Sequence, residues 1–372
     1  MSALAVPLGQ LPLLVRVLRD PASASGLGLA DWDLLLRQAA GADVTPILLV
    51  VLEDAGQLAT VPDAPRAPRE WARTAASRHA QAVRHEVRQI GLALAGTGLP
   101  LILLKGAAYA IARLPPGRGR MFSDIDILVP KERLAEVEAA LMLHGWISTH
   151  HDAYDQRYYR EWMHELPPMQ HVRRGNVIDV HHAILPETAA QRPDPAKLRA
   201  AAVPAVASAP GAPALLMLAP HDMVLHSAVH LFWDGEFDHG LRDLVDLDRL
   251  LRAFGAAPGF WTGLPARARE LQLARPLYYA LRYCRRLLGT PVPPAVEEAL
   301  REDAPNRPLR WLMDRLFGRA LLPRHPSCED HFSGLARFAL YVRGNWLRMP
   351  PLLLSRHLFH KAFLSPRTGE AR

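Results

Sequence analysis

Two aspartates separated by one residue, Asp124 and Asp126, are the residues of this chain whose type and spacing most clearly suit metal binding. They lie in the apolar run 124–129, whose composition predicts a β-strand. Alternate side chains of a strand point to one face, so both carboxylates would project together while Ile125 and Ile127 face a core. Neighbouring like charges repel unless a cation lies between them, and a divalent ion with oxygen ligands is the usual solution. The pair therefore predicts a metal site, and a solvated strand edge is the simpler alternative.

A short apolar strand and a glycine precede this pair. Residues 101–104 form the strand, Lys105 and Gly106 follow it, and a helical pattern begins at Ala107. Glycine lets the backbone approach a ligand closely, and the free N–H groups at a helix start favour anions. We therefore expect Lys105, Gly106 and Ala107 to bind phosphate, with ordinary turn chemistry as the alternative.

A third carboxylate lies on a later strand. The strand-like runs 169–173 and 177–182 flank a turn at 174–176, which predicts a hairpin. Asp179 stands between apolar residues of the second run, and an unpaired carboxylate is costly to bury. A metal shared with the first two aspartates would account for it, and a bond to a backbone turn or an ion pair with Arg173 is the alternative. His181 would share its strand face and contact the substrate or orient the carboxylate.

Basic residues and histidines add further candidates. Arg120 lies in the loop before the paired acids, and a guanidinium suits phosphate geometry, so we expect Arg120 and the adjacent Ser123 to contact a nucleotide. His226 and His230 have the i, i+4 spacing of zinc ligands on a helix. No glutamate follows His226 and no third ligand is marked, so packing or substrate contact is favoured over a zinc-dependent hydrolase site.

These motifs, in this order, resemble the DNA polymerase β-like nucleotidyltransferase superfamily, and more closely a bacterial family of uncharacterised nucleotidyltransferases. The resemblance covers about 90–255 and rests on 104–106 (LKG), Arg120, 124–129 (DIDILV) and 178–182 (IDVHH), with a helical continuation in 215–222, 225–230 and 241–251.

The resemblance implies transfer of a nucleoside monophosphate from an NTP such as ATP to an acceptor hydroxyl, with release of pyrophosphate. It implies that Asp124, Asp126 and Asp179 are catalytic and hold Mg²⁺, with Mn²⁺ as the alternative ion. Three classes of acceptor remain as alternatives, namely a small molecule, a peptide or protein, and RNA.

One motif departs from the superfamily. Gly106 and Ala107 stand where most members have Gly-Ser or Gly-Gly, so a phosphate-binding hydroxyl is absent. This departure supports an alternative function, a weak or inactive adaptor that keeps the fold and binds RNA, membrane or a protein partner. Retention of all three carboxylates favours the enzyme.

Composition limits the class of protein. With 372 residues and 49% hydrophobic residues, the chain can bury a sizeable core. Two cysteines are too few for a disulfide scaffold and fit a reducing compartment. The N-terminus lacks the pattern of a signal peptide, so we expect a cytoplasmic protein, with peripheral membrane association as an option.

The elements predict an α/β (α+β) fold, a small mixed sheet with flanking helices plus helical regions before and after it. We expect an N-terminal helical region at 1–70, a nucleotidyltransferase core at 71–200, a helical domain at 201–330 and a basic aromatic tail at 331–372.

The tail has an unusual charge pattern. No acidic residue lies between Asp330 and Glu370, whereas the stretch contains Arg337, Arg343, Arg348, Arg356, Lys361 and Arg367. Aromatic and aliphatic residues are interleaved with these charges, a pattern typical of a helix on an anionic membrane surface or against a partner. We expect 331–364 to dock on such a surface, and simple packing against the helical domain is the alternative.

Overall fold

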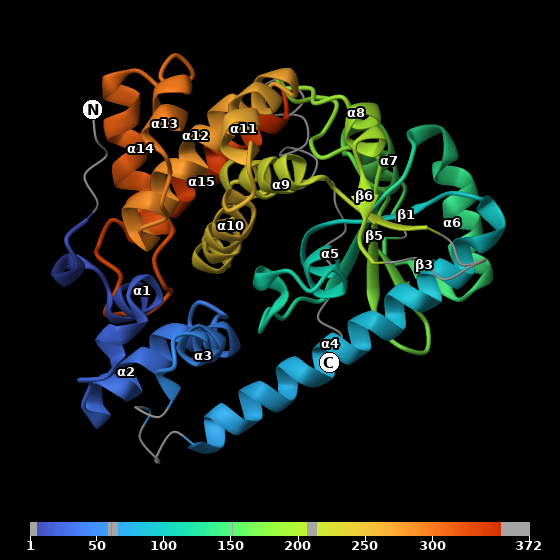
Figure 1. Ribbon diagram of the computed structural model, residues 1–372. Coiled ribbons are helices and arrows are strands. Elements are labelled where there is room, and N and C mark those ends of the chain that lie inside the picture. The colour runs from blue at the N-terminus through green and yellow to red at the C-terminus, as the bar shows by residue number, and fades with distance from the viewer. Residues whose placement is uncertain (1–5, 59–60, 62–65, 151, 207–213, 351–372) are drawn as a thin grey trace.

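The computed structural model describes residues 6–58, 61, 66–150, 152–206 and 214–350. Three short helices begin the chain, α1 (Leu13–Arg19), α2 (Leu29–Ala40) and α3 (Thr45–Asp54). The long helix α4 (Arg66–Leu94) then runs along one edge of the molecule to the sheet (Figure 1) and contacts α3, α5 and α6 on its way. This helix therefore links the N-terminal helices to the α/β part.

Seven short strands form one mixed sheet, in the order β3-β4-β5-β2-β1-β7-β6. The strands are β1 (Leu101–Leu103), β2 (Asp124–Leu128), β3 (Trp146–Ser148), β4 (Met169–His171), β5 (Val177–His181), β6 (Val203–Pro204) and β7 (Leu215–Met217). The pairs β2–β5 and β1–β7 are parallel, and the other pairs are antiparallel. Strands β4 and β5 form the hairpin that the sequence predicts, and β6 and β7 add a second antiparallel pair.

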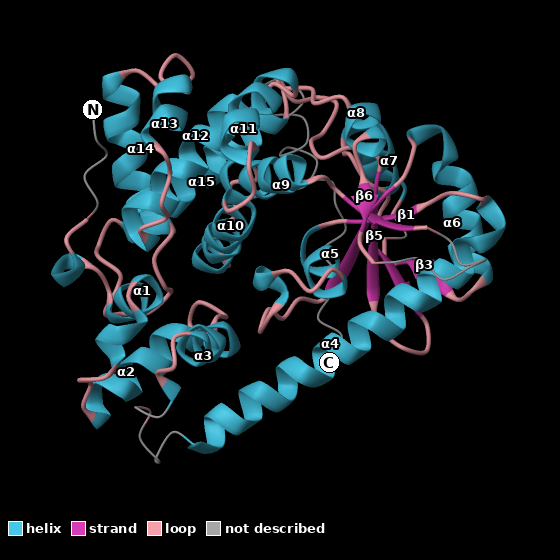
Figure 2. Cartoon of the chain, in the orientation of Figure 1, coloured by secondary structure: helices cyan, strands magenta, loops and turns pink. Residues whose placement is uncertain are grey.

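Helices lie between the strands and after them. Those of the α/β part are α5 (Lys105–Ile111), α6 (Leu134–Leu143), α7 (Ala153–Trp162) and α8 (Pro195–Ala200). The C-terminal helices are α9 (Pro220–Trp233), α10 (Gly240–Gly255), α11 (Phe260–Glu270), α12 (Ala274–Tyr283), α13 (Pro294–Ala299), α14 (Arg307–Ala320) and α15 (Ser333–Arg348). Figure 2 shows the strands gathered on one side of the molecule and the C-terminal helices on the other.

The predicted fold class is confirmed, since a mixed sheet is combined with helical parts on both sides of it in the chain. Strand β2 forms because 125, 127, 128 and 129 are apolar and buried. The helix expected after Pro130 begins as a 3₁₀ turn at Lys131–Arg133 and continues as α6. No helix in the described part of the chain is long and apolar enough to span a bilayer.

Helix α15 packs against α14 and α9. Gly344 lies so close to Gly235 that a Cβ at Gly344 would meet the Gly235 Cα at 2.6 Å. Arg343 is inserted among the rings of Trp233, Tyr279 and Phe317 and donates to the Phe232 carbonyl at 2.7 Å. The first half of the predicted tail is therefore anchored on the C-terminal helices.

Candidate active site

The three predicted metal ligands meet because of the register between β2 and β5. The strands run parallel with Asp126 opposite Asp179, and residues paired in this way present their side chains on the same face. Asp124 lies two residues before Asp126 and shares that face. One carboxylate oxygen from each aspartate lies within 4.8 Å of the other two. The sheet thus brings together three acids that are up to 55 residues apart in the chain.

Asp126 is the most strongly engaged of the three. Its side chain is 7% exposed, and its Oδ1 lies 3.5 Å from Lys105 Nζ and accepts a hydrogen bond of 2.8 Å from His181 Nε2. Burial by itself would raise the pKa of Asp126, but the Lys105 and His181 charges outweigh it and hold this pKa well below its usual range. Asp126 is therefore the carboxylate of the three that most strongly favours its ionised form.

Asp179 is in the opposite situation. Burial, reinforced by the negative charges of Asp126 and Glu165, raises the pKa of Asp179 to about 8. Its Oδ1 is buried, and no hydrogen bond reaches it from the residues that the structure describes. A buried carboxylate oxygen without a partner is costly, and a cation would satisfy it. The all-oxygen donor set and this unpaired atom both fit a hard divalent ion such as Mg²⁺.

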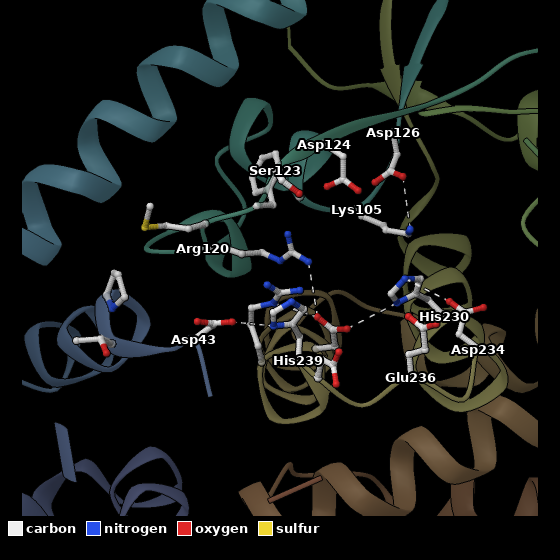
Figure 3. A pocket seen from close by; sticks show the side chains of 18 of the residues that line it. Asp43, Lys105, Arg120, Ser123, Asp124, Asp126, His230, Asp234, Glu236 and His239 are labelled. Atoms are coloured by element: carbon white, nitrogen blue, oxygen red, sulfur yellow. Dashed lines mark hydrogen bonds and ion pairs between the residues drawn. The ribbon is translucent and has the colours of Figure 1, made fainter. Parts of the chain in front are cut away.

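Lys105 begins α5 with a left-handed backbone conformation, φ 41°. This region costs a residue with a Cβ on the order of 1 kcal/mol or more, and such strain is concentrated at functional sites. The conformation accompanies the placement of the Lys105 ammonium beside Asp126 (Figure 3). The predicted neighbours Lys105 and Asp126 are thus in contact.

Arg120 is held in place by an acid of α10 and by two aromatic rings. Its Nε donates to Asp246 Oδ2 at 2.5 Å, and its guanidinium lies over the rings of Phe122 and Tyr109. Gly106 lies directly beneath this arrangement, because a Cβ there would meet Arg120 Nη1 at 2.5 Å and the Phe122 ring at 2.7 Å. The absence of a side chain at 106 therefore allows Arg120 to sit beside α5.

We expect Gly106→Ala to destabilise the protein by about 1–3 kcal/mol, because Arg120 and Phe122 must move from a well-packed site. The same movement should weaken nucleotide binding. Thermal melting and nucleotide titration measure the two effects. The matched control is Gly318→Ala in α14, where a Cβ meets nothing within 4 Å and a slight gain in stability is expected. Unchanged melting and binding in Gly106→Ala would show that Arg120 does not depend on this contact.

A cavity of about 760 Å³ opens in front of these residues (Figure 3). Of the predicted site residues, those that line it are Lys105, Gly106, Arg120, Ser123, Asp124, Asp126 and His230. The far wall comes from the N-terminal and C-terminal helices, through residues that include Asp43, Trp71, Asp234, Glu236 and Asp243. The cavity thus lies between all three parts of the chain.

The other predicted residues lie outside the cavity lining. Ala107 is fully packed in the core, so its side chain has no access to a ligand. His226 is buried, and burial together with the nearby Lys105 charge lowers its pKa well below the ordinary value. His181 is buried against Asp126, and its pKa is raised because Glu165 and Asp126 outweigh the effect of burial. Of the three histidines expected to contact substrate, the cavity lining contains only His230, whose ring nitrogens lie 3.4 Å from Asp234 Oδ2 and 3.6 Å from Asp243 Oδ2.

Several residues of the site are absent from the sequence-based prediction. Glu165 and His164 lie in the segment between α7 and β4, where no periodic pattern marks them. Asp243 and Asp246 both engage Arg120 from α10. A signal for the second pair exists, since Asp243 and Asp246 are three residues apart in the helical run 241–251 and so share a face, and acids are unusual on a buried face.

Comparison with known proteins gives one family and one structural neighbour. The model of a family described as an uncharacterised nucleotidyltransferase matches residues 29–289, which include every predicted site residue. A solved structure, the nucleotidyltransferase toxin MenT4 from Mycobacterium tuberculosis H37Rv, is 18% identical with a TM-score of 0.33, over 73% of this chain and 98% of that chain. A search of curated proteins gave no match.

Proposed function

Because the chain belongs to the family of uncharacterised nucleotidyltransferases, we propose that it transfers a nucleoside monophosphate from an NTP to the hydroxyl of an acceptor and releases pyrophosphate. One observation carries the proposal, the convergence of three carboxylates, two of which line a large cavity together with a lysine and an arginine. A structural cluster would have no need to place ionised acids around an unpaired carboxylate oxygen.

Asp124, Asp126 and Asp179 would hold Mg²⁺, which when bound neutralises charge on the attacking and leaving oxygens of the transfer. Mn²⁺ suits the same oxygen donors. Because the Lys105 and His181 contacts fix Asp126, this carboxylate would have the most rigid position of the three.

Lys105 and Arg120 would bind the triphosphate. Both line the cavity next to the carboxylates, and Gly106, which carries no side chain, lets the Arg120 guanidinium lie against the start of α5. Ser123 would add a hydroxyl from the other side. The Asp246 contact occupies Arg120 Nε, and Asp243 Oδ1 lies 3.7 Å from Nη2, so Nη1 is the nitrogen that would meet a phosphate oxygen.

In the transfer, the acceptor oxygen would form a bond to the α-phosphorus as the bond to the β-phosphate oxygen breaks. The hydroxyl proton must leave during this step. Asp179, whose Oδ1 has no hydrogen-bond partner among the described residues, would polarise this hydroxyl. Completion of the metal ligand set is its other proposed role.

The test is incubation of the full-length protein with each α-labelled NTP, Mg²⁺ and pools of acceptors, with pyrophosphate release as a second readout. We expect Mg²⁺-dependent label transfer that disappears in Asp124→Asn. Nucleotide binding that is independent of Mg²⁺, with no transfer for any acceptor pool, would favour the adaptor function. The chelator EDTA provides the control for metal dependence.

We also propose that the tail docks on a membrane surface. Along α15, the large apolar side chains of Phe332, Leu335, Phe338, Val342 and Trp346 are exposed, at spacings of three or four residues that place them on one face. The positive charges of this helix are engaged elsewhere, since Arg337 pairs with Glu329 and Arg348 with Asp234. The described part of the tail therefore offers an apolar face, and Arg356, Lys361 and Arg367 lie outside the described residues.

We expect Phe338→Ser combined with Trp346→Ser to reduce binding to vesicles containing phosphatidylglycerol by about tenfold or more, because two exposed aromatic rings lose their burial in lipid. Vesicle co-sedimentation at low and high salt is the measurement. The control is Leu143→Ser, which removes an exposed apolar side chain of α6 instead. If the unmodified protein does not bind vesicles, the docking proposal is wrong. If binding is lost at high salt, the binding depends on positive charges beyond α15 and not on the apolar face.

A further inference from the structure

A second group of potential metal ligands lies on the buried side of Asp126. It consists of His164, Glu165 and His181, and one ligand atom from each lies within 4.8 Å of the other two. None of the three lines the cavity of about 760 Å³ described above. The group shares no residue with the carboxylate triad, and the hydrogen bond between His181 and Asp126 connects the two.

The backbone holds these ligands rigidly. The segment that carries His164 and Glu165 runs antiparallel to the end of β5, with a bridge between Glu165 and His181. Leu166 N–H donates to the Val180 carbonyl at 2.9 Å, and His182 N–H donates to the His164 carbonyl at 2.8 Å. The three side chains thus project from two hydrogen-bonded strands whose register is fixed, which is the rigidity that a metal site requires.

One imidazole nitrogen of the group has no partner among the described residues. His164 Nδ1 is buried, and no hydrogen bond reaches it from the described part of the chain. The His181 side chain is only 4% exposed, and its Nδ1 lies 3.2 Å from Glu165 Oε2. A buried polar atom without a partner costs about 1–3 kcal/mol. An ion bound between the three side chains would satisfy His164 Nδ1 and replace the direct contact between His181 and Glu165.

The donor chemistry identifies the class of ion. Two imidazoles and one carboxylate suit Zn²⁺ and similar transition metals, whereas the triad of carboxylates suits Mg²⁺. Zinc bonds of 2.0–2.1 Å place neighbouring ligand atoms of a tetrahedron about 3.3 Å apart. The 3.2 Å between His181 Nδ1 and Glu165 Oε2 matches this separation.

The outer contact of His181 also fits a metal site. Its Nε2 lies 2.8 Å from Asp126 Oδ1, and in the neutral imidazole that donates this bond the lone pair is on Nδ1, where a metal would bind. Histidine ligands commonly donate their other ring N–H to a carboxylate in this way, and the bond fixes both the tautomer and the ring orientation. Asp126 in turn pairs with Lys105 at 3.5 Å, so the nearby ammonium is already matched by a negative charge.

We propose that His164, Glu165 and His181 bind a divalent transition metal of the Zn²⁺ class. Bound at this site, the ion would lock His181 and through it the orientation of Asp126. The binding site stands apart from nucleotidyl transfer, and only its effect on Asp126 rests on the proposed function.

The experiment is a Co²⁺ titration of the metal-stripped, full-length protein, read by the visible absorption of tetrahedral cobalt. We expect one equivalent to bind, to be displaced by Zn²⁺ and to remain in Asp124→Asn. His164→Gln and Glu165→Gln should each weaken binding by more than about 100-fold, because each loses a direct ligand. The matched control is His226→Gln, a buried histidine near Lys105 that is not part of the group, and it should leave the cobalt signal unchanged.

Absence of a stoichiometric cobalt signal in the unmodified protein would overturn the proposal, and so would an equal signal in His164→Gln and Glu165→Gln. In that case the group is a hydrogen-bonded ion pair that orients Asp126. Circular dichroism of each variant identifies any loss of folding, and the titration of the unmodified protein decides the matter even if a variant fails to fold. Transfer activity without cobalt binding would reject this site alone, and cobalt binding without transfer would reject the proposed function alone.

Discussion

Asp126→Asn should lower kcat/KM for nucleotidyl transfer by about 10³-fold or more. The metal contributes several kcal/mol to stabilisation of the transition state, and Asp126 is the ligand at the centre of the group. The same change should also destabilise the fold by about 3 kcal/mol, since the Lys105 ammonium and His181 lose the negative charge that they share. Steady-state kinetics and thermal melting, both at a temperature where the variant is folded, measure the two effects.

The control for this prediction is Asp238→Asn. Asp238 also lines the cavity, but its carboxylate is exposed and paired with Arg324. This variant should keep its activity and stability within small factors. Full transfer activity in Asp126→Asn would rule out the metal-dependent mechanism, whatever its effect on melting.

Asp179→Asn should have the opposite effect on stability. In metal-free buffer the pKa of Asp179 in the folded protein is raised to about 8, so the folded state keeps a proton that the unfolded chain has lost. Stability from this group is therefore present below about pH 4 and declines as pH rises toward about 8, by a few kcal/mol in total. The asparagine variant should lose this decline and be more stable than the unmodified protein at pH 8 in EDTA.

The activity of Asp179→Asn should fall mainly through kcat, with a smaller change in nucleotide affinity, because the interaction is made chiefly in the transition state. Melting curves between pH 4 and pH 9, with and without Mg²⁺, test the stability part. Mg²⁺ should stabilise the unmodified protein at pH 8 and have little effect on the variant. Asp33→Asn, on the exposed face of α2, is the control. If the stability of Asp179→Asn and of the unmodified protein depends on pH in the same way, the pKa of Asp179 is not raised in the folded protein.

The sequence predicts the strands that carry the triad because their signals are local. Alternation around Asp124 and Asp126, the turn at 174–176 and the apolar run before Lys105 each involve only a few neighbouring residues, and β1, β2, β4 and β5 form at these places. The pairing of β2 with β5 joins distant segments and is not part of the sequence-based prediction, and a slip of one residue in its register would turn Asp179 toward the opposite face.

Contacts between distant segments carry no local signal. Asp246 binds Arg120 across 126 positions of the chain, and Glu165 reaches His181 from a segment without a periodic pattern. The exposure of side chains depends on the same packing. Arg343 counts as part of a basic tail in the sequence, whereas the fold buries it among three aromatic rings.

The parallel pairing of β2 with β5 also determines when the site can exist during folding. Parallel strands require a long crossover, and here α6, β3, α7 and β4 intervene between the two partners. The entropy of closing that loop is lost before Asp179 can meet Asp126, so contacts of this kind form slowly. A nascent chain that ends before β5 contains β2 and both of its aspartates but lacks the third ligand. Binding of a divalent ion would therefore favour the fully paired sheet over every earlier intermediate, and added metal should slow unfolding more than it speeds folding.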